Sequence, residues 1–248
     1  MKLIGHRGSS HTAPENTLAS VRLAWEERAD GVEIDVHLTR DNRIVVIHDD
    51  NTFRTTQRIA AIRDLTLDQI KQLDAGTWKD DRWAGEPVPE LSEVLTTVPA
   101  GKLLFVEIKC GTEVLSELRK LVERHPLVAR SLVFVGFSLN TMRLTKRQFP
   151  KCDVFWNVEV ATDVELGGTK PPADELARKA REAGIDGLGV SFCDGISAAF
   201  ANVVRGAGLK LFVWTVDEPE GAVRMRTAGA HYLATNRPGW LREQITRE

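Results

Sequence analysis

Seven polar side chains of the types used in phosphate and acid–base chemistry stand in or directly after short apolar runs. They are His6, Arg7, Glu33, Asp35, His48, Glu107 and Lys109. Glu33 and Asp35 are two residues apart, and so are Glu107 and Lys109; residues two apart on a strand point to the same face. An isolated buried charge is very costly, so carboxylates in apolar strands need a cation nearby. The pattern therefore predicts one polar site at which these side chains meet.

The residue types indicate metal-assisted acid–base chemistry. Three carboxylates offer hard oxygen ligands with no thiolate beside them, which favours Mg²⁺ or Ca²⁺ over zinc or copper. Histidine suits proton transfer near neutral pH because its unperturbed pKa is about 6.5. Taken singly, Glu107 and Lys109 would be a structural ion pair and His48 a core or rim histidine. The joint occurrence of all seven residues favours a functional site.

Short β-branched runs alternate with amphipathic segments along the whole chain. The expected strands are Lys2–Gly5, Val32–His37, Ile44–His48, Leu103–Lys109, Leu132–Phe137, Val154–Val160, Gly187–Phe192, Leu209–Thr215 and Tyr232–Thr235. The expected helices lie near 15–29, 112–124, 139–149, 173–183, 197–207, 218–228 and 239–247. Runs that are apolar at consecutive positions are typical of parallel strands buried on both faces. Glycine recurs between a helix and the next strand, at Gly184, Gly208 and Gly229, where a left-handed C-cap is needed.

This order of elements predicts an α/β fold, the (β/α)8 or TIM barrel, with Ile44–His48 as an extra extension. A barrel of this kind has about 250 residues, and the chain has 248. A doubly wound open sheet is the alternative, but no Gly-x-Gly-x-x-Gly motif follows the first strand. Active sites of such barrels lie at the C-terminal ends of the strands. The seven polar residues are therefore expected at one end of the barrel.

The alternation of strands and helices breaks once, between the second and third barrel strands. Residues 49–101 are turn-rich, and they include a capped helix start with Thr66 as N-cap and Gln69 three residues later. A loop this long inside a compact domain is usually functional or disordered, and its two tryptophans favour a folded segment. We therefore expect a single catalytic domain, 1–248, in which 49–101 form an inserted subdomain that caps the active-site end.

Composition bounds the function classes. Lys and Arg number 33 against 35 Asp and Glu, a net charge of −2, whereas domains that bind nucleic acid usually have a strong basic excess. Apolar stretches long enough for a signal peptide or a membrane span are missing from the sequence. Three widely spaced cysteines, Cys110, Cys152 and Cys193, do not indicate a disulfide framework. We expect a cytoplasmic protein with no nucleic-acid partner and no membrane insertion; whether it forms a homo-oligomer is not defined by the sequence.

Seven short motifs make the pattern more specific. They are His6-Arg7-Gly8, Pro14-Glu15-Asn16-Thr17, Glu33-Ile34-Asp35-Val36, Thr39-Arg40-Asp41, Val45-Val46-Ile47-His48-Asp49, Phe105-Val106-Glu107-Ile108-Lys109 and Val213-Trp214-Thr215-Val216. Together they resemble the glycerophosphodiester phosphodiesterase family, in its bacterial cytosolic type, and the run from Leu65 to Leu95 resembles that family's insertion. The resemblance covers essentially the whole chain. It departs from the family pattern at Asn236, where an aspartate is commoner, but asparagine can still accept a hydrogen bond.

The resemblance implies hydrolysis of a small-molecule glycerophosphodiester to sn-glycerol 3-phosphate and an alcohol, with one bound divalent cation, Mg²⁺ or Ca²⁺. The implied metal ligands are Glu33, Asp35 and Glu107, the general acid and base are His6 and His48, and the phosphate-binding cations are Arg7 and Lys109. The sequence leaves open which histidine is the acid. It also leaves open whether water attacks directly or a glycerol hydroxyl first forms a cyclic phosphate.

Two further side chains have competing interpretations. Trp214 is a candidate for lining the substrate pocket, although an aromatic residue in a barrel core needs no function. His37 shares its parity with Glu33 and Asp35, and we expect a solvated residue at the rim of the site.

Two other functions are weighed against this one. Barrels of the phospholipase C or sphingomyelinase D type share the two-histidine, carboxylate–metal arrangement, but the resemblance of the insertion argues against them. An inactive barrel that only binds a phosphate ligand would have lost a histidine or a metal ligand. Every expected position is filled in this sequence.

Overall fold

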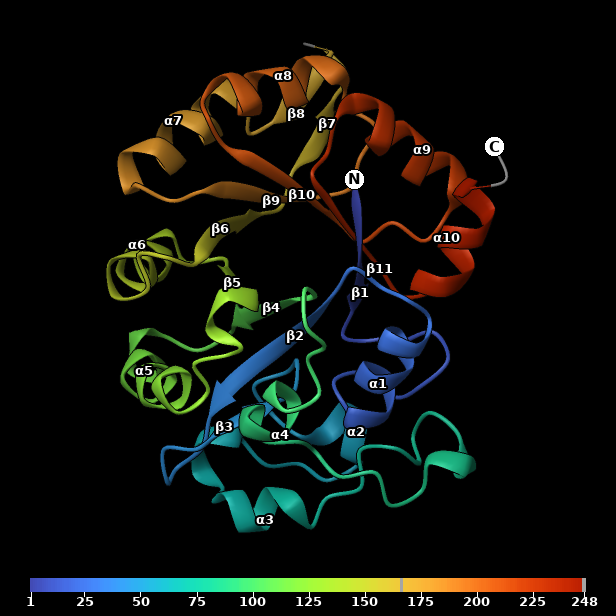
Figure 1. The fold of residues 1–248 in the computed structure, drawn as a ribbon, viewed down its shortest axis with the longest axis vertical. Coiled ribbons are helices and arrows are strands. Elements are labelled where there is room, and N and C mark those ends of the chain that lie inside the picture. The colour runs from blue at the N-terminus through green and yellow to red at the C-terminus, as the bar shows by residue number, and fades with distance from the viewer. Residues whose placement is uncertain (166, 247–248) are drawn as a thin grey trace.

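Strands and helices alternate along the computed structural model, which describes residues 1–165 and 167–246 (Figure 1). The strands are β1 (Lys2–His6), β2 (Gly31–Leu38), β3 (Ile44–Val46), β4 (Leu103–Ile108), β5 (Leu132–Gly136), β6 (Asp153–Val158), β7 (Ala161–Asp163), β8 (Gly168–Lys170), β9 (Gly187–Ser191), β10 (Lys210–Trp214) and β11 (Tyr232–Thr235). The α-helices are α1 (Leu18–Glu26), α2 (Phe53–Thr56), α3 (Leu67–Lys71), α4 (Leu91–Leu95), α5 (Leu115–Arg124), α6 (Leu139–Gln148), α7 (Ala173–Ala183), α8 (Ala198–Gly206), α9 (Pro219–Ala228) and α10 (Pro238–Thr246). Four 3₁₀ helices are η1 (Ile62–Asp64), η2 (Asp81–Trp83), η3 (Thr112–Val114) and η4 (Ala129–Ser131).

Eight of the strands form a closed parallel barrel. They pair in the order β1-β2-β4-β5-β6-β9-β10-β11, and β11 pairs back to β1. The predicted (β/α)8 barrel is therefore confirmed, and the open-sheet alternative is wrong because the two edges of the sheet pair with each other. Helices ring the barrel in Figure 1, so the strands are buried on both faces, as their consecutive apolar residues predicted.

Aromatic side chains fill the inside of the barrel. The rings of Phe105, Phe155, Phe212 and Tyr232 lie with centroids 5.0 to 6.2 Å apart, in tilted and edge-on arrangements. Side chains alternate along a strand, so the next inward-facing residues stand one step closer to the C-terminal strand ends. The aromatic layer thus separates the polar side chains at the C-terminal strand ends from the Lys210–Asp153 ion pair at the other end of the barrel.

Two details differ from the expectations, and a third lies partly outside the described residues. The strand predicted over 44–48 is the shorter β3, antiparallel to β2, so His48 lies in the loop beyond it. A hairpin of β7 and β8 between β6 and α7 was not predicted; its strands have three residues each, too short for an alternating pattern to appear. The last helix was expected over 239–247, and its final residue lies outside the described part of the chain.

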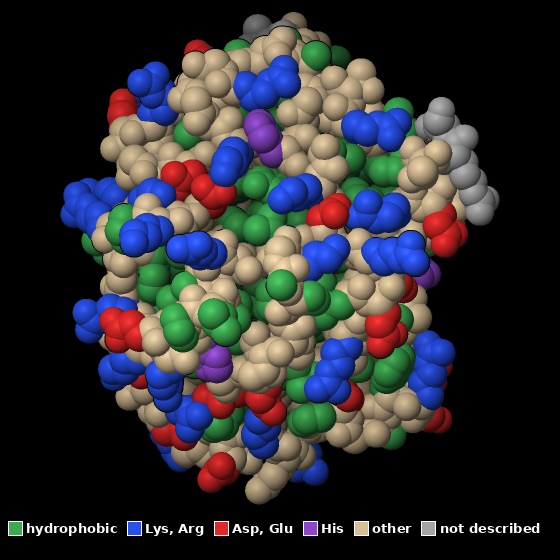
Figure 2. All heavy atoms as spheres, in the orientation of Figure 1, with side chains coloured by type: hydrophobic (Ala, Val, Ile, Leu, Met, Phe, Trp, Pro, Cys, Tyr) green, Lys and Arg blue, Asp and Glu red, His purple; other side chains and the backbone are tan. Residues whose placement is uncertain are grey.

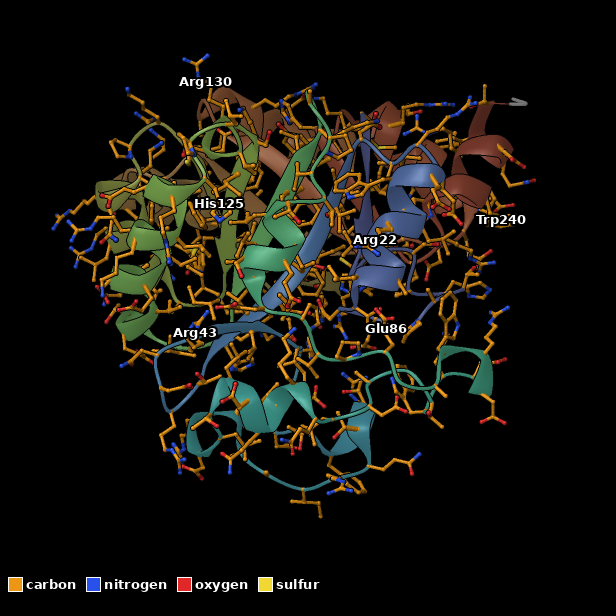
Figure 3. All side chains as sticks on the ribbon, turned by 60° about the horizontal axis from the view of Figure 1, so that its bottom comes forward. Arg22, Arg43, Glu86, His125, Arg130 and Trp240 are labelled. Atoms are coloured by element: carbon orange, nitrogen blue, oxygen red, sulfur yellow. The ribbon has the colours of Figure 1, made fainter. Side chains whose placement is uncertain are left out.

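Residues 49–101, between β3 and β4, contain α2, η1, α3, η2 and α4 and share a separate apolar cluster with β3 and Ile47. The cluster consists of Val45, Ile47, Ile62, Ile70, Ala75 and Val88. The predicted helix start is confirmed, because the Thr66 side chain accepts from the Gln69 backbone in a capping box. In Figure 3 this segment, cyan to green, lies across one end of the barrel, opposite the end at which Arg130 lies.

The surface carries charges of both signs. Figure 2 shows Lys and Arg interspersed with Asp and Glu on the face in view, as expected for a net charge of −2. Among the described helices, none is long and apolar enough to cross a membrane.

Candidate active site

One cavity of about 440 Å³ lies at the C-terminal ends of the barrel strands. Its lining residues are His6, Arg7, Glu33, His48, Glu107, Lys109, Phe137, Asn157, Glu159, Phe212, Trp214 and Thr215. Six of the seven polar residues singled out from the sequence are in this lining. The seventh, Asp35, lies directly beneath it and pairs with Arg7 and Lys109.

The carboxylates of Glu33, Asp35 and Glu107 form a compact cluster. An oxygen atom from each lies within 4.8 Å of the others, because Asp35 on β2 is in register with Glu107 on β4 and Glu33 precedes Asp35 by two residues. The Arg7 Nε lies 3.3 Å from Asp35 Oδ2. The Lys109 Nζ lies 2.9 Å from Glu107 Oε1 and 3.7 Å from Asp35 Oδ1. Two cations therefore face three buried carboxylates.

This cluster has the donor set of a hard cation site. Burial, with the charges of Asp35 and Glu107, raises the pKa of Glu33 well above its ordinary value. Burial and the charge of Asp35 likewise raise the pKa of Glu107. The Glu33 Oε1 is buried, and no described residue donates a hydrogen bond to it. A dication would satisfy this oxygen and relieve the repulsion, so the residues fit Mg²⁺ or Ca²⁺.

Arg7 reaches the cluster from a left-handed backbone conformation. Its φ is 56° and that of Gly8 is 88°; for a non-glycine residue this conformation costs roughly 1–2 kcal/mol. The strained turn directs the Arg7 N–H to Glu33 Oε2 at 3.0 Å and the guanidinium to Glu15 Oε1 at 2.9 Å. A Cβ on Gly8 would lie 2.5 Å from Ser20, so only glycine fits here.

His6 is partly buried at the end of β1. Its Nδ1 lies 2.8 Å from Asn236 Oδ1, and its Nε2 lies 4.0 Å from Glu33 Oε2. Burial, aided by the charge of Arg7, lowers the pKa of His6 to about 4. The imidazole is therefore neutral at neutral pH. The expectation that Asn236 can accept a hydrogen bond is confirmed.

His48 lies on the other side of the cavity, between the carboxylate of Asp49 and the ammonium group of Lys109. Its Nδ1 is 2.6 Å from Asp49 Oδ1, and its Nε2 is 3.1 Å from Lys109 Nζ. Burial favours protonation of Asp49, but hydrogen bonds from Arg54 and His48 outweigh it and lower the Asp49 pKa to about 2. Because the ionised carboxylate only accepts hydrogen bonds, the Nδ1 of His48 carries a proton.

Arg54 of α2 joins the two sides of the site. It donates to both oxygens of Asp49 at 2.8 and 3.1 Å and to both oxygens of Glu15 at 2.9 and 2.8 Å. Glu15 in turn accepts from Arg7. One guanidinium from the segment 49–101 thus orients the acid that holds His48 and the acid that holds Arg7.

A match over almost the whole chain decides the family. Residues 6–240 match the model of the glycerophosphoryl diester phosphodiesterase family. The chain belongs to this family. It is an enzyme, a glycerophosphodiester phosphodiesterase.

Related proteins of known name and structure agree with this. A glycerophosphodiester phosphodiesterase of Caldanaerobacter subterraneus subsp. tengcongensis is 32% identical over 244 residues, which cover 96% of this chain and 95% of that protein. An Oleispira antarctica phosphodiesterase, solved in complex with the product sn-glycerol-3-phosphate, is 27% identical with a TM-score of 0.86, covering 99% and 97% of the two chains. A glycerophosphodiester phosphodiesterase of Agrobacterium tumefaciens, 23% identical, shares the fold with a TM-score of 0.78 over 100% of both chains.

An aromatic pair forms one wall of the cavity in this glycerophosphodiester phosphodiesterase. Phe137 and Trp214 meet edge to face with ring centroids 5.6 Å apart, and the Lys109 Nζ lies 5.6 Å from the centre of the Phe137 ring. Trp214 therefore belongs to the cavity as well as to the barrel core. Phe137 was not predicted as a site residue, because it follows β5 as an ordinary apolar residue.

Several polar partners in the site were missed at the level of sequence. Asn16 donates to Asp35 Oδ2 at 2.8 Å, and Asn157 donates to Glu107 Oε2 at 3.1 Å. Asn157 could have been predicted, because it lies two residues after Phe155 on β6 and therefore faces the same inner side of the barrel. The expectation for His37 is wrong: it is buried, with 8% of its surface exposed, because its Nε2 lies 3.1 Å from the backbone oxygen of His48.

Proposed function

We propose that this chain hydrolyses glycerophosphodiesters to sn-glycerol 3-phosphate and an alcohol, using two histidines and one divalent cation, Mg²⁺ or Ca²⁺. The observation that carries the proposal is a single cavity in which His6 and His48 flank a cluster of three carboxylates and two cations. Family membership supports the reaction, and the product in the Oleispira antarctica complex supports glycerol 3-phosphate as the retained half of the substrate.

Charge balance explains why the site suits a phosphodiester. The carboxylates of Glu33, Asp35 and Glu107 exceed the cations of Arg7 and Lys109 by one negative charge. A dication held by the three carboxylates reverses that excess to one positive charge, which a singly charged phosphodiester neutralises. When bound, the metal supplies Lewis acidity at a phosphoryl oxygen. Arg7 and Lys109 bind the other phosphate oxygens and stabilise the charge that concentrates there in the transition state.

We assign His6 as the general base. Its pKa of about 4 leaves the imidazole neutral before turnover, and its Nδ1 is engaged by Asn236. The Nε2 faces the carboxylate cluster at which the phosphate would bind. This nitrogen takes the proton from the attacking hydroxyl, whether water or a glycerol hydroxyl.

We assign His48 as the general acid. The ionised carboxylate of Asp49 accepts from its Nδ1 at 2.6 Å, which fixes the orientation of the ring and leaves the Nε2 for proton transfer. Lys109 is 3.1 Å from the Nε2 in this structure. When Lys109 turns to the phosphate, the Nε2 is free to carry a proton and deliver it to the leaving alkoxide. The leaving alcohol departs along the wall formed by Phe137 and Trp214.

The substrate class has a direct test. Glycerophosphocholine, glycerophosphoethanolamine and glycerophosphoglycerol are incubated with the enzyme and Mg²⁺ or Ca²⁺, and glycerol 3-phosphate is measured enzymatically. We expect release from this panel, and no cleavage of sphingomyelin or phosphatidylinositol. Turnover of either lipid in preference to the panel would favour the phospholipase C or sphingomyelinase D type. Binding of glycerophosphodiesters without turnover would favour an inactive phosphate-binding barrel.

Metal affinity is expected to weaken as the pH falls. The pKa values of Glu33 and Glu107 are raised by burial and by neighbouring carboxylates, so protons compete with the metal at a higher pH than for ordinary carboxylates. The apparent dissociation constant should increase by up to about tenfold per pH unit for each proton displaced. Isothermal titration with Mg²⁺ or Ca²⁺ between about pH 8 and pH 5, in buffers of different ionisation enthalpy, measures both the affinity and the proton release. An affinity that is constant across this range would contradict the prediction.

The same proposal covers the organisation of the chain. We propose one catalytic domain over 1–248, with 49–101 as an inserted subdomain that caps the active-site end, because Arg54 of this segment contacts two acids at the site. We also propose a cytoplasmic enzyme that acts on a small molecule without a nucleic-acid partner or membrane insertion.

A further inference from the structure

The hydrogen bonds behind His6 form a connected chain. The Oδ1 of Asn236 lies 2.8 Å from His6 Nδ1, and the Nδ2 of Asn236 donates to Asp217 Oδ2 at 2.6 Å. The other oxygen of Asp217 accepts from the Asn236 backbone N–H at 2.7 Å and from the Thr235 hydroxyl at 2.8 Å. Asp217 therefore has three donors, all from the end of β11.

This chain determines the orientation of the Asn236 amide. A carboxylate only accepts hydrogen bonds, whereas an amide donates through nitrogen and accepts through oxygen. The end of Asn236 that faces Asp217 must therefore be its NH₂ group, and the end that faces His6 must be its oxygen. An oxygen acceptor requires a proton on His6 Nδ1. The Nε2, on the cavity side, then keeps its lone pair.

We propose that Asp217 is a positioning residue that acts through Asn236 to hold His6 in the Nδ1–H tautomer. The inference rests on the proposed function in one respect, the use of His6 Nε2 as a base. It also explains why an amide stands at position 236 in this chain. A carboxylate there would face that of Asp217 across the 2.6 Å that now separates a donor from an acceptor.

Asp217→Asn should invert the tautomer without leaving an unsatisfied group. The new amide can still accept from the Asn236 backbone and the Thr235 hydroxyl, so its NH₂ faces Asn236. The Asn236 side chain then flips, presents its own NH₂ to His6 Nδ1, and forces the proton to Nε2. We expect kcat to fall by at least about 10²-fold with KM little changed; a wrong catalytic tautomer costs about 10⁴-fold in the serine protease triad.

The swap variant, Asp217→Asn with Asn236→Asp, is the matched control. It keeps one amide and one carboxylate in contact: the amide at 217 donates to the carboxylate at 236, which accepts from His6 Nδ1. We expect the Nδ1–H tautomer to return and kcat to recover to within about tenfold of the wild type. A residue that only stabilised the fold would not show loss in the single variant and recovery in the swap.

The tautomer is read directly by ¹⁵N NMR of histidine-labelled enzyme with Mg²⁺, at about pH 8, above the ordinary histidine pKa of about 6.5. The expected results are Nδ1–H in the wild type and the swap and Nε2–H in Asp217→Asn, with the His48 signals unchanged. An Nε2–H tautomer in the wild type overturns the inference whether or not a variant folds. The inference is also overturned if Asp217→Asn keeps the wild-type tautomer or the wild-type kcat. It is overturned as well if His6 in the swap variant keeps the Nε2–H tautomer. A wild type that releases no glycerol 3-phosphate from the panel refutes the proposed function instead, and the tautomer reading still stands.

Discussion

Exhaustive chelation with EDTA is expected to abolish the release of glycerol 3-phosphate, and added Mg²⁺ or Ca²⁺ to restore it. Without the dication, Glu33, Asp35 and Glu107 leave a net negative charge at the place where an anionic phosphate must bind. Arg7 and Lys109 are then held by these carboxylates rather than by substrate. A metal acting as a Lewis acid contributes several kcal/mol to such a reaction, so a loss of about 10³-fold or more is expected.

The metal assignment has a measurement that does not depend on turnover. Binding to the folded state alone stabilises it by mass action, so the melting temperature should rise with Mg²⁺ or Ca²⁺. Glu33→Gln, which keeps the size of the side chain and removes its charge, should lose most of this rise. As a matched control, Glu159→Gln changes a carboxylate of the same cavity outside the cluster and should keep it. Full activity after chelation, or the same metal-dependent rise in melting temperature in both variants, would contradict the metal assignment.

The barrel was predictable because its signals are local and repeat along the chain. Apolar runs of strand length, amphipathic helices and a glycine after the helices α7 and α9 each reflect a short-range requirement of the backbone. The short hairpin of β7 and β8 offered no such repetition. The strand at β3 was predicted too long because Ile47 continues the apolar run up to His48, although the structure ends the strand at Val46.

The site was predictable only where the chemistry lies on the strands themselves. The spacing of Glu33 and Asp35 on β2 already placed two carboxylates on one face. The partners that orient the site come from distant loops: Asn236 lies 230 positions from His6, and Arg54 lies 39 positions from Glu15. Barrel closure brings them together, and a single sequence contains no period or spacing from which such pairs can be read.

His6→Gln and His48→Gln are each expected to lower kcat by about 10²–10⁴-fold, the usual range for a general acid or base. Glutamine keeps a polar group in the cavity but cannot transfer a proton. Circular dichroism and the metal-dependent rise in melting temperature should stay near those of the wild type, because neither histidine belongs to the carboxylate cluster. A variant with nearly full activity would remove that histidine from the mechanism.

The leaving group distinguishes the two roles. A glycerophosphodiester of 4-nitrophenol needs little protonation of its leaving oxygen, so it bypasses a general acid but not a general base. His48→Gln should therefore recover most of its lost rate on this substrate, whereas His6→Gln should remain slow. The assignment follows from the surroundings of each ring: Asp49 holds His48 through its Nδ1 and leaves the Nε2 for the leaving oxygen, while burial and Arg7 keep His6 neutral. Recovery by His6→Gln and not by His48→Gln would reverse the assignment of acid and base.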